Sequence, residues 1–90
     1  MKEQIKERVV KLLKEATGQE VSLKDNLKAL NLDEFDFVML VSDLEEEYNI
    51  EIPDEDVRRM YPVDVDFGEK KEYAKVNQLI DYVARKVKEK

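Results

Sequence analysis

The sequence predicts an all-α protein, namely a single four-helix bundle over residues 1–90 with a long first loop and a short third helix. Four segments carry apolar residues at the three- and four-residue spacing of an amphipathic helix, and no segment alternates for long enough to build a sheet. The chain has only 2 Gly and 2 Pro, so a β-sandwich with many tight turns is not expected. A chain of 90 residues has the length of one small domain with one core.

The clearest helical patterns lie near the two ends of the chain. The first apolar stripe consists of Ile5, Val9, Leu12, Leu13 and Ala16. The last stripe consists of Val76, Leu79, Ile80, Val83, Ala84 and Val87. Gly18 predicts the end of the first helix, because glycine tolerates the left-handed conformation that follows many helices. Lysines near the end of the last helix suit its dipole, which favours cations there.

The second helix is predicted to begin at Asp33, whose carboxylate can cap the free N–H groups of the first turn. Its core stripe consists of Phe37, Leu40, Val41, Leu44 and Tyr48. A second apolar edge consists of Phe35, Val38 and Met39. A surface helix needs only one such stripe, so this helix either packs on several sides or exposes apolar side chains to a partner. The solvent exposure of Phe35 and Met39 distinguishes these two alternatives.

A short third helix is predicted to begin at Pro53 and Asp54 and to end before Pro62. The connection before the second helix and the connection after the third helix are long for so small a bundle. Residues 17–32 hold five apolar side chains that can anchor the first loop on the helices, and these are Val21, Leu23, Leu27, Leu30 and Leu32. Residues 62–74 form the other long connection. Loops beyond about 12 residues are uncommon and often functional.

Composition excludes most catalytic and metal chemistry. The chain contains no His and no Cys, so imidazole and thiolate ligands, thiol nucleophiles and Ser-His pairs are absent. Its 22 acidic and 16 basic residues give a net charge of −6, which disfavours binding to nucleic-acid phosphates. No apolar run reaches the about 20 residues that span a bilayer, and the charged N-terminal residues do not read as a secretory signal. We expect a cytoplasmic, non-enzymatic protein without a membrane span.

The acidic residues are concentrated in the middle of the chain. From Asp33 to Asp56 there are 11 acids and no Lys or Arg, and the rest of the chain carries a net charge of +5. Such a block causes self-repulsion, so it is either a solvated acidic face or a docking surface for proteins with basic patches. Two poorer matches are a calcium loop at residues 64–68, whose glycine comes one position early, and acid–base catalysis by a carboxylate pair.

Four short motifs stand in the acidic region and in the last helix. They are Asp-Glu-Phe-Asp at 33–36, Leu-Glu-Glu-Glu-Tyr at 44–48, Ile-Pro-Asp-Glu at 52–55 and Leu-Ile-Asp-Tyr-Val at 79–83. This arrangement resembles the acyl carrier protein family, whose members read Asp-Ser-Leu-Asp, Leu-Glu-Glu-Glu-Phe, Ile-Pro-Asp-Glu and Ile-Asp-Tyr-Ile at these places. The resemblance implies a four-helix bundle of acyl-carrier type. The long connection at 62–74 is similar to that of specialised carriers of unusual or very long acyl chains.

The resemblance also implies a prosthetic group, and the sequence departs from the family at its attachment point. In the family, the serine of Asp-Ser-Leu-Asp bears a phosphopantetheine arm that holds an acyl chain as a thioester. Glu34 occupies this position, and a carboxylate cannot replace the hydroxyl that accepts the arm. Ser42 is the nearest hydroxyl on this helix, but it lies mid-helix. We therefore expect no phosphopantetheine arm, no catalytic residue and no metal site.

These observations predict an acyl-carrier-like interaction module that docks basic protein partners, such as acyl-handling or biosynthetic enzymes, through its acidic second helix. The residues predicted to contact partners are Asp33, Glu34, Phe35, Asp36, Met39, Glu45, Glu46 and Glu47. One alternative is a working carrier of fatty-acid, lipid or polyketide-type biosynthesis with another attachment residue, and a second is a designed carrier-fold bundle without a natural function. Charged residues make up 42% of the chain, with Lys and Glu favoured, as in thermophilic or designed proteins. We expect a thermostable monomer.

Overall fold

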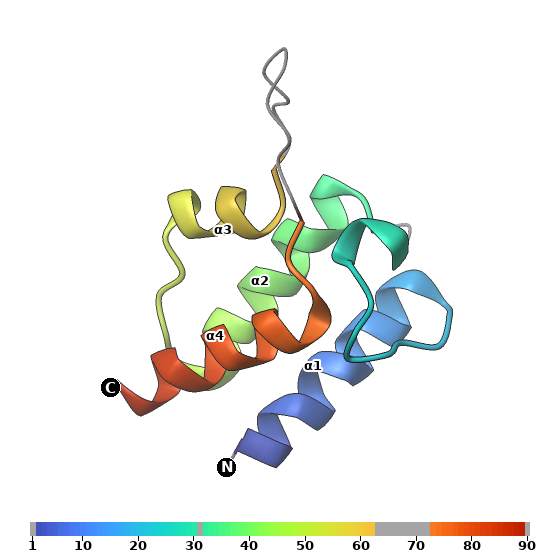
Figure 1. Ribbon diagram of the computed structural model, residues 1–90. Coiled ribbons are helices and arrows are strands. Elements are labelled where there is room, and N and C mark those ends of the chain that lie inside the picture. The colour runs from blue at the N-terminus through green and yellow to red at the C-terminus, as the bar shows by residue number, and fades with distance from the viewer. Residues whose placement is uncertain (1, 31, 63–72, 90) are drawn as a thin grey trace.

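A computed structural model describes residues 2–30, 32–62 and 73–89 of the chain, which form α-helices without a strand. The four helices are α1 (Lys2–Thr17), α2 (Glu34–Tyr48), α3 (Asp54–Met60) and α4 (Val76–Lys88). In Figure 1 the three long helices run along a common direction, and the short α3 lies to one side of them. The predicted all-α four-helix fold with a long first loop and a short third helix is confirmed.

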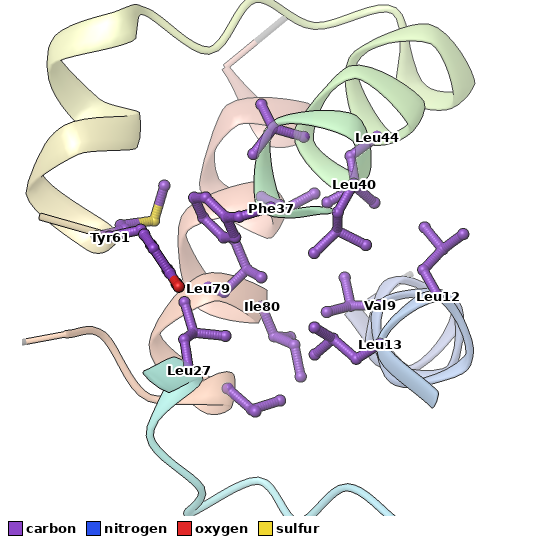
Figure 2. Packing of buried hydrophobic residues seen from close by; sticks show 14 of the residues in the cluster. Val9, Leu12, Leu13, Leu27, Phe37, Leu40, Leu44, Tyr61, Leu79 and Ile80 are labelled. Atoms are coloured by element: carbon purple, nitrogen blue, oxygen red, sulfur yellow. The ribbon is translucent and has the colours of Figure 1, made fainter. Parts of the chain in front are cut away.

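The core is one cluster of apolar side chains from all four helices and the first loop. Figure 2 shows Phe37 and Leu40 of α2 pointing toward Leu13 of α1 and Ile80 of α4. The predicted core stripe of α1 is confirmed except at its last position, because Ala16 is exposed. Burial of these side chains drives folding, at about 25 cal/mol for each Å² of apolar surface removed from water.

The first loop is anchored to the segment just before α4 by backbone and side-chain hydrogen bonds. The Leu27 N–H donates to the Ala74 carbonyl at 3.0 Å, and the Asn26 side-chain amide donates to the Tyr73 carbonyl at 2.9 Å. A short 3₁₀ helix runs from Leu27 to Leu30, and both of these leucines are buried. The sequence pattern did not predict this helix. The loop is therefore part of the packed structure, as its apolar anchors indicated.

Backbone conformation at the helix ends follows the sequence signals. Gly18, which follows α1, has a φ of 69°, so the predicted glycine stop of the first helix is confirmed. Asn49 after α2 has a φ of 52°, and asparagine is among the residues that tolerate this conformation best. Pro53 precedes the first residue of α3 with a φ of −60°, which suits its ring.

Two tyrosines attach α3 to the rest of the bundle. The buried Tyr61 stacks its ring on Phe37, with 5.2 Å between the ring centroids, and donates its hydroxyl to the Leu32 carbonyl. Tyr82 of α4 donates its hydroxyl to a carboxylate oxygen of Asp56 in α3. A seven-residue helix is marginal alone, so these contacts and the buried Met60 hold α3 in place.

Tyr82 predicts a loss of stability at alkaline pH. Burial raises the pKa of Tyr82 above its ordinary value, and the hydrogen bond to Asp56 raises it further. The folded state thus favours the neutral phenol, so this stabilisation is present below pH 10 and is lost as the pH rises beyond the unfolded pKa of about 10. We expect Tyr82→Phe to lower the free energy of unfolding by about 1 kcal/mol at pH 7 and to flatten its decline above pH 10. Urea titrations at pH 7 and above pH 10 measure both; an equally steep alkaline decline in both proteins would contradict this assignment.

Several expectations fall on residues outside the described ranges. The calcium-loop pattern at 64–68 and most of the connection at 62–74 lie there. Among the residues that the structure describes, no group of three or more acidic side chains is arranged to hold a metal ion. No helix in this part of the chain is long and apolar enough to cross a membrane. The single-domain and monomer expectations stay predictions.

Candidate functional site

The start of α2 is set by a side-chain cap. Asp33 has an extended backbone, and its carboxylate accepts a hydrogen bond from the Asp36 N–H at 2.7 Å. The Phe37 N–H donates to the Asp33 carbonyl at 3.0 Å, which closes the first helical turn. Asp33 is therefore the cap just before the helix, and the exposed Glu34 is its first residue.

Two stripes of equal spacing lie on α2. The buried or half-buried stripe consists of Phe37, Leu40, Val41, Leu44 and Tyr48. The exposed stripe contains the residue two positions before each of these, and consists of Phe35, Val38, Met39, Ser42 and Glu46. An offset of two residues turns a side chain about 200° around the helix axis, so the two stripes face nearly opposite ways.

The first two turns of the exposed stripe are apolar, and we call Phe35, Val38 and Met39 the ridge. Their exposed fractions are 71%, 46% and 53%, respectively. The alternative that Phe35 and Met39 pack in the core is therefore excluded. Val38 is not among the predicted contact residues, although its position three residues after Phe35 places it on the same face.

A hollow lies on each side of the ridge. The α2–α3 hollow has a volume of about 200 Å³ and is lined in part by Glu34, Val38, Asp54 and Val57. The α1–α2 hollow has a volume of about 260 Å³ and is lined in part by Leu12, Glu15, Asp36, Met39 and Asp43. Each hollow thus combines apolar walls with carboxylates.

Negative charge reaches the buried wall of the α2–α3 hollow. Tyr61 forms part of this wall. Burial raises the pKa of Tyr61, and the carboxylates of Asp33 and Glu34 are among the charges that raise it further. The acids at the start of α2 therefore contribute a negative electrostatic potential at Tyr61, in the wall of this hollow.

The eight predicted contact residues form two separate groups. Asp33, Glu34, Phe35, Asp36 and Met39 surround the start of α2, whereas the three consecutive glutamates at 45–47 lie in its last turns. Between Asp36 and Glu46 the helix advances about 15 Å. The structure brings the first group together around the ridge but does not place the glutamates beside it.

Two of these three glutamates make contacts within the protein. The half-buried Glu45 accepts a hydrogen bond from the Ile52 N–H at 3.0 Å, which ties the segment before α3 to α2. Glu47 pairs with Arg8 of α1 at 2.7 Å. Glu46 is exposed on the stripe that contains the ridge. Local spacing could not indicate these roles, because Glu47 and Arg8 are 39 residues apart.

The hydrogen bond to Ile52 predicts unequal effects of two adjacent substitutions. Glu45→Ala leaves the part-buried Ile52 N–H without its acceptor and is expected to lower the free energy of unfolding by about 1–2 kcal/mol. Glu46→Ala makes the same chemical change at an exposed position and is expected to stay within about 0.5 kcal/mol of wild type. Urea unfolding followed by circular dichroism measures both. Equal losses in the two variants would show that the bond to Ile52 contributes nothing.

The chemistry available at the start of α2 is that of carboxylates. Glu34 lies where the helix dipole favours negative charge but carries no hydroxyl. Ser42 is exposed in the third turn of the helix, two turns beyond Glu34. The arrangement can attract and orient cations, and its apolar ridge can bury surface against another molecule.

Comparison with known protein families gives one match over this region. A family model described as a phosphopantetheine attachment site matches residues 3–63. The match extends over α1, the first loop, α2 and α3, so it includes the ridge and both hollows.

Proposed function

Because the chain belongs to the phosphopantetheine-attachment family, we propose that it is a carrier-type domain that docks protein partners on α2 and bears no phosphopantetheine arm. Membership supports the carrier-type role, since the match covers residues 3–63. The docking role and the missing arm go beyond membership and rest on the residues around the start of α2.

One observation carries the docking role: α2 exposes an apolar ridge beside Glu34 and other acids. Phe35 is 71% exposed and Met39 is 53% exposed, and exposed apolar side chains that adjoin one another often mark interaction sites. Carboxylates around an apolar centre would orient a basic partner during encounter, while burial of the ridge would supply affinity. Binding of this kind requires no catalysis by the domain itself.

The residues at the start of α2 do not fit attachment of phosphopantetheine. Attachment forms a phosphate ester with a side-chain hydroxyl, and Glu34 offers an exposed carboxylate at the first residue of the helix. Its negative charge would also repel an incoming pyrophosphate. Ser42 does carry a hydroxyl, but it lies two turns further along, on the same exposed helix face as the ridge.

Intact-mass spectrometry tests the missing arm. We expect the mass of the purified chain to remain unchanged after incubation with coenzyme A and a broad-specificity phosphopantetheinyl transferase. A transferase-active carrier domain in a parallel reaction serves as the positive control. A mass increase of one phosphopantetheine, at Ser42 or any other residue, would show that the chain is a working carrier and would overturn this part of the proposal.

A further inference from the structure

A third hollow lies between α3 and α4 and shares no lining residue with the two hollows beside the ridge. This α3–α4 hollow has a volume of about 390 Å³, within the range of about 300–1,000 Å³ that is common for sites of small ligands. Three of its lining residues are cations, namely Arg59 of α3 with Arg85 and Lys86 of α4, and two are the acids Asp56 and Glu89. In an acidic protein, this hollow therefore carries an excess of positive charge.

The carboxylate of Asp56 is already engaged inside the protein. One of its oxygens accepts the hydroxyl of Tyr82, and the other lies 3.7 Å from a guanidinium nitrogen of Arg59. The side chain of Asp56 is 17% exposed, whereas that of Arg59 is 76% exposed. A guanidinium has five N–H donors, and this single long contact engages one nitrogen. Most donors of Arg59 are therefore available to another anion.

Tyr82 holds the two cations of α4 without neutralising them. The guanidinium carbon of Arg85 lies 5.8 Å from the centre of the Tyr82 ring, and the Nζ atom of Lys86 lies 5.7 Å from it. A ring face attracts a cation but carries no net charge that would cancel it. The ion pairs within the described part of the chain include neither Arg85 nor Lys86. Both positive charges therefore stay available beside the hollow.

Arg59 and Arg85 also act on one common side chain. Burial and the hydrogen bond to Asp56 raise the pKa of Tyr82, and the positive charges of Arg85 and Arg59 offset part of this rise. Two guanidiniums from different helices therefore lie close enough to the same phenol to influence it. The bond between Tyr82 and Asp56 joins α3 to α4, so it also fixes the two helices that carry these cations.

We infer that the α3–α4 hollow binds a small molecule through a phosphate monoester group, which is shared by Arg59, Arg85 and Lys86. A phosphate monoester carries a charge of about −1.5 to −2 and three strong acceptor oxygens. A carboxylate carries one charge and two oxygens, which a single guanidinium can satisfy. The three cations therefore suit phosphate better than carboxylate. The inference goes beyond the proposed function, because no residue of α2 lines this hollow.

Two simpler explanations account for less. Cations near the end of a helix suit its dipole, but this applies to Lys88 as well as to Arg85 and Lys86, and Lys88 does not line the hollow. A nucleic acid would also bring phosphates, but the net charge of −6 would repel a long polyanion that extends beyond the hollow. A small ligand contacts the cations of the hollow alone.

Titration with glycerol phosphate tests the site directly. Chemical shifts of the ¹⁵N-labelled chain are followed in a phosphate-free buffer, with sodium chloride adjusted to keep the ionic strength constant. We expect saturable shifts centred on residues 56–60 and 82–89. Sodium acetate in a parallel titration is expected to bind roughly tenfold more weakly, because it offers one charge and two oxygens.

Two pairs of variants separate the hollow from general charge. Arg59→Gln and Arg85→Gln each remove a cation that lines it, and each is expected to raise the Kd of glycerol phosphate roughly fivefold. Arg58→Gln is the control on α3, because Arg58 lines the α2–α3 hollow instead. Lys88→Gln is the control on α4. Both controls are expected to change Kd less than about twofold, and thermal melts verify that each variant is folded.

Glu89→Gln provides a test of opposite sign. It removes an acid that lines the hollow and would repel a bound phosphate, so it is expected to lower Kd about twofold. A higher Kd would contradict the assigned role of this hollow.

The remaining outcomes decide the inference without affecting the proposed function. Shifts that fail to saturate, or that spread over the whole chain, would overturn the site. Equal effects of Arg59→Gln and Arg58→Gln would mean that only the total charge matters and would also overturn it. Acetate binding as tight as glycerol phosphate would refute the preference for phosphate. Docking on α2 is left intact by each of these results, because it uses other residues.

Discussion

Phe37→Ala is expected to lower the free energy of unfolding by about 3–5 kcal/mol. Phe37 is 1% exposed, and its ring stacks on Tyr61 with 5.2 Å between the ring centroids. Removing the ring leaves a cavity in the core and also removes the contact that holds the end of α3. The free energy of unfolding of a small domain is commonly about 5–15 kcal/mol, so this substitution would remove a large part of it.

Phe35→Ala is the matched control for this prediction. It removes the same side chain from the same helix, two residues earlier, at a position that is 71% exposed. We expect its free energy of unfolding to lie within about 0.5 kcal/mol of wild type. Urea unfolding followed by circular dichroism at 222 nm gives both values. Similar losses in the two variants would mean that Phe35 is covered in solution and that the ridge is not exposed.

Glu34→Ser is expected to convert the chain into a substrate of a phosphopantetheinyl transferase. The substitution restores a hydroxyl at the exposed first residue of α2, directly after the capping Asp33. It produces the order Asp-Ser-Phe-Asp, which resembles the family motif. Intact-mass spectrometry should then show a gain of one phosphopantetheine, and peptide mapping should locate it at position 34.

Glu34→Ala is the control for this gain, because it removes the carboxylate without supplying a hydroxyl. It is expected to stay unmodified, as is the wild-type chain. Ser22 and Ser42 are present in all three proteins, so modification in every one of them would place the attachment at a residue other than position 34, which peptide mapping would identify. A folded Glu34→Ser variant that stays unmodified would mean that other parts of the transferase-recognition surface have also changed.

Local sequence patterns were sufficient for the helices and their ends. The stripes of α1 and α4 follow directly from helical spacing, and Asp33 and Gly18 mark helix ends through side-chain and backbone properties of single residues. These features depend on neighbours within about one turn. The single 3₁₀ turn that begins at Leu27 was missed because it depends on the packing of the first loop against the start of α4.

The candidate site was predicted in part. The acidic character of α2 and the importance of Glu34 follow from the sequence and its resemblance. The prediction that the glutamates at 45–47 contact partners together with the first turns stays a prediction, and the structure adds the helix length that separates the two groups. The sequence pattern did not indicate the contacts of Glu45 with Ile52 and of Glu47 with Arg8, because they join residues that are distant in the chain.

The sequence by itself determined that α2 carries a core stripe and a second, shorter apolar edge, and that Glu34 stands where the family has serine. It also indicated that the stripe containing Phe37 is the core stripe, because that stripe is apolar along the whole helix. Only the tertiary structure decided that the stripe containing Phe35 is exposed. Whether another element covers a helix face depends on contacts between distant segments, and helical spacing carries no information about such contacts.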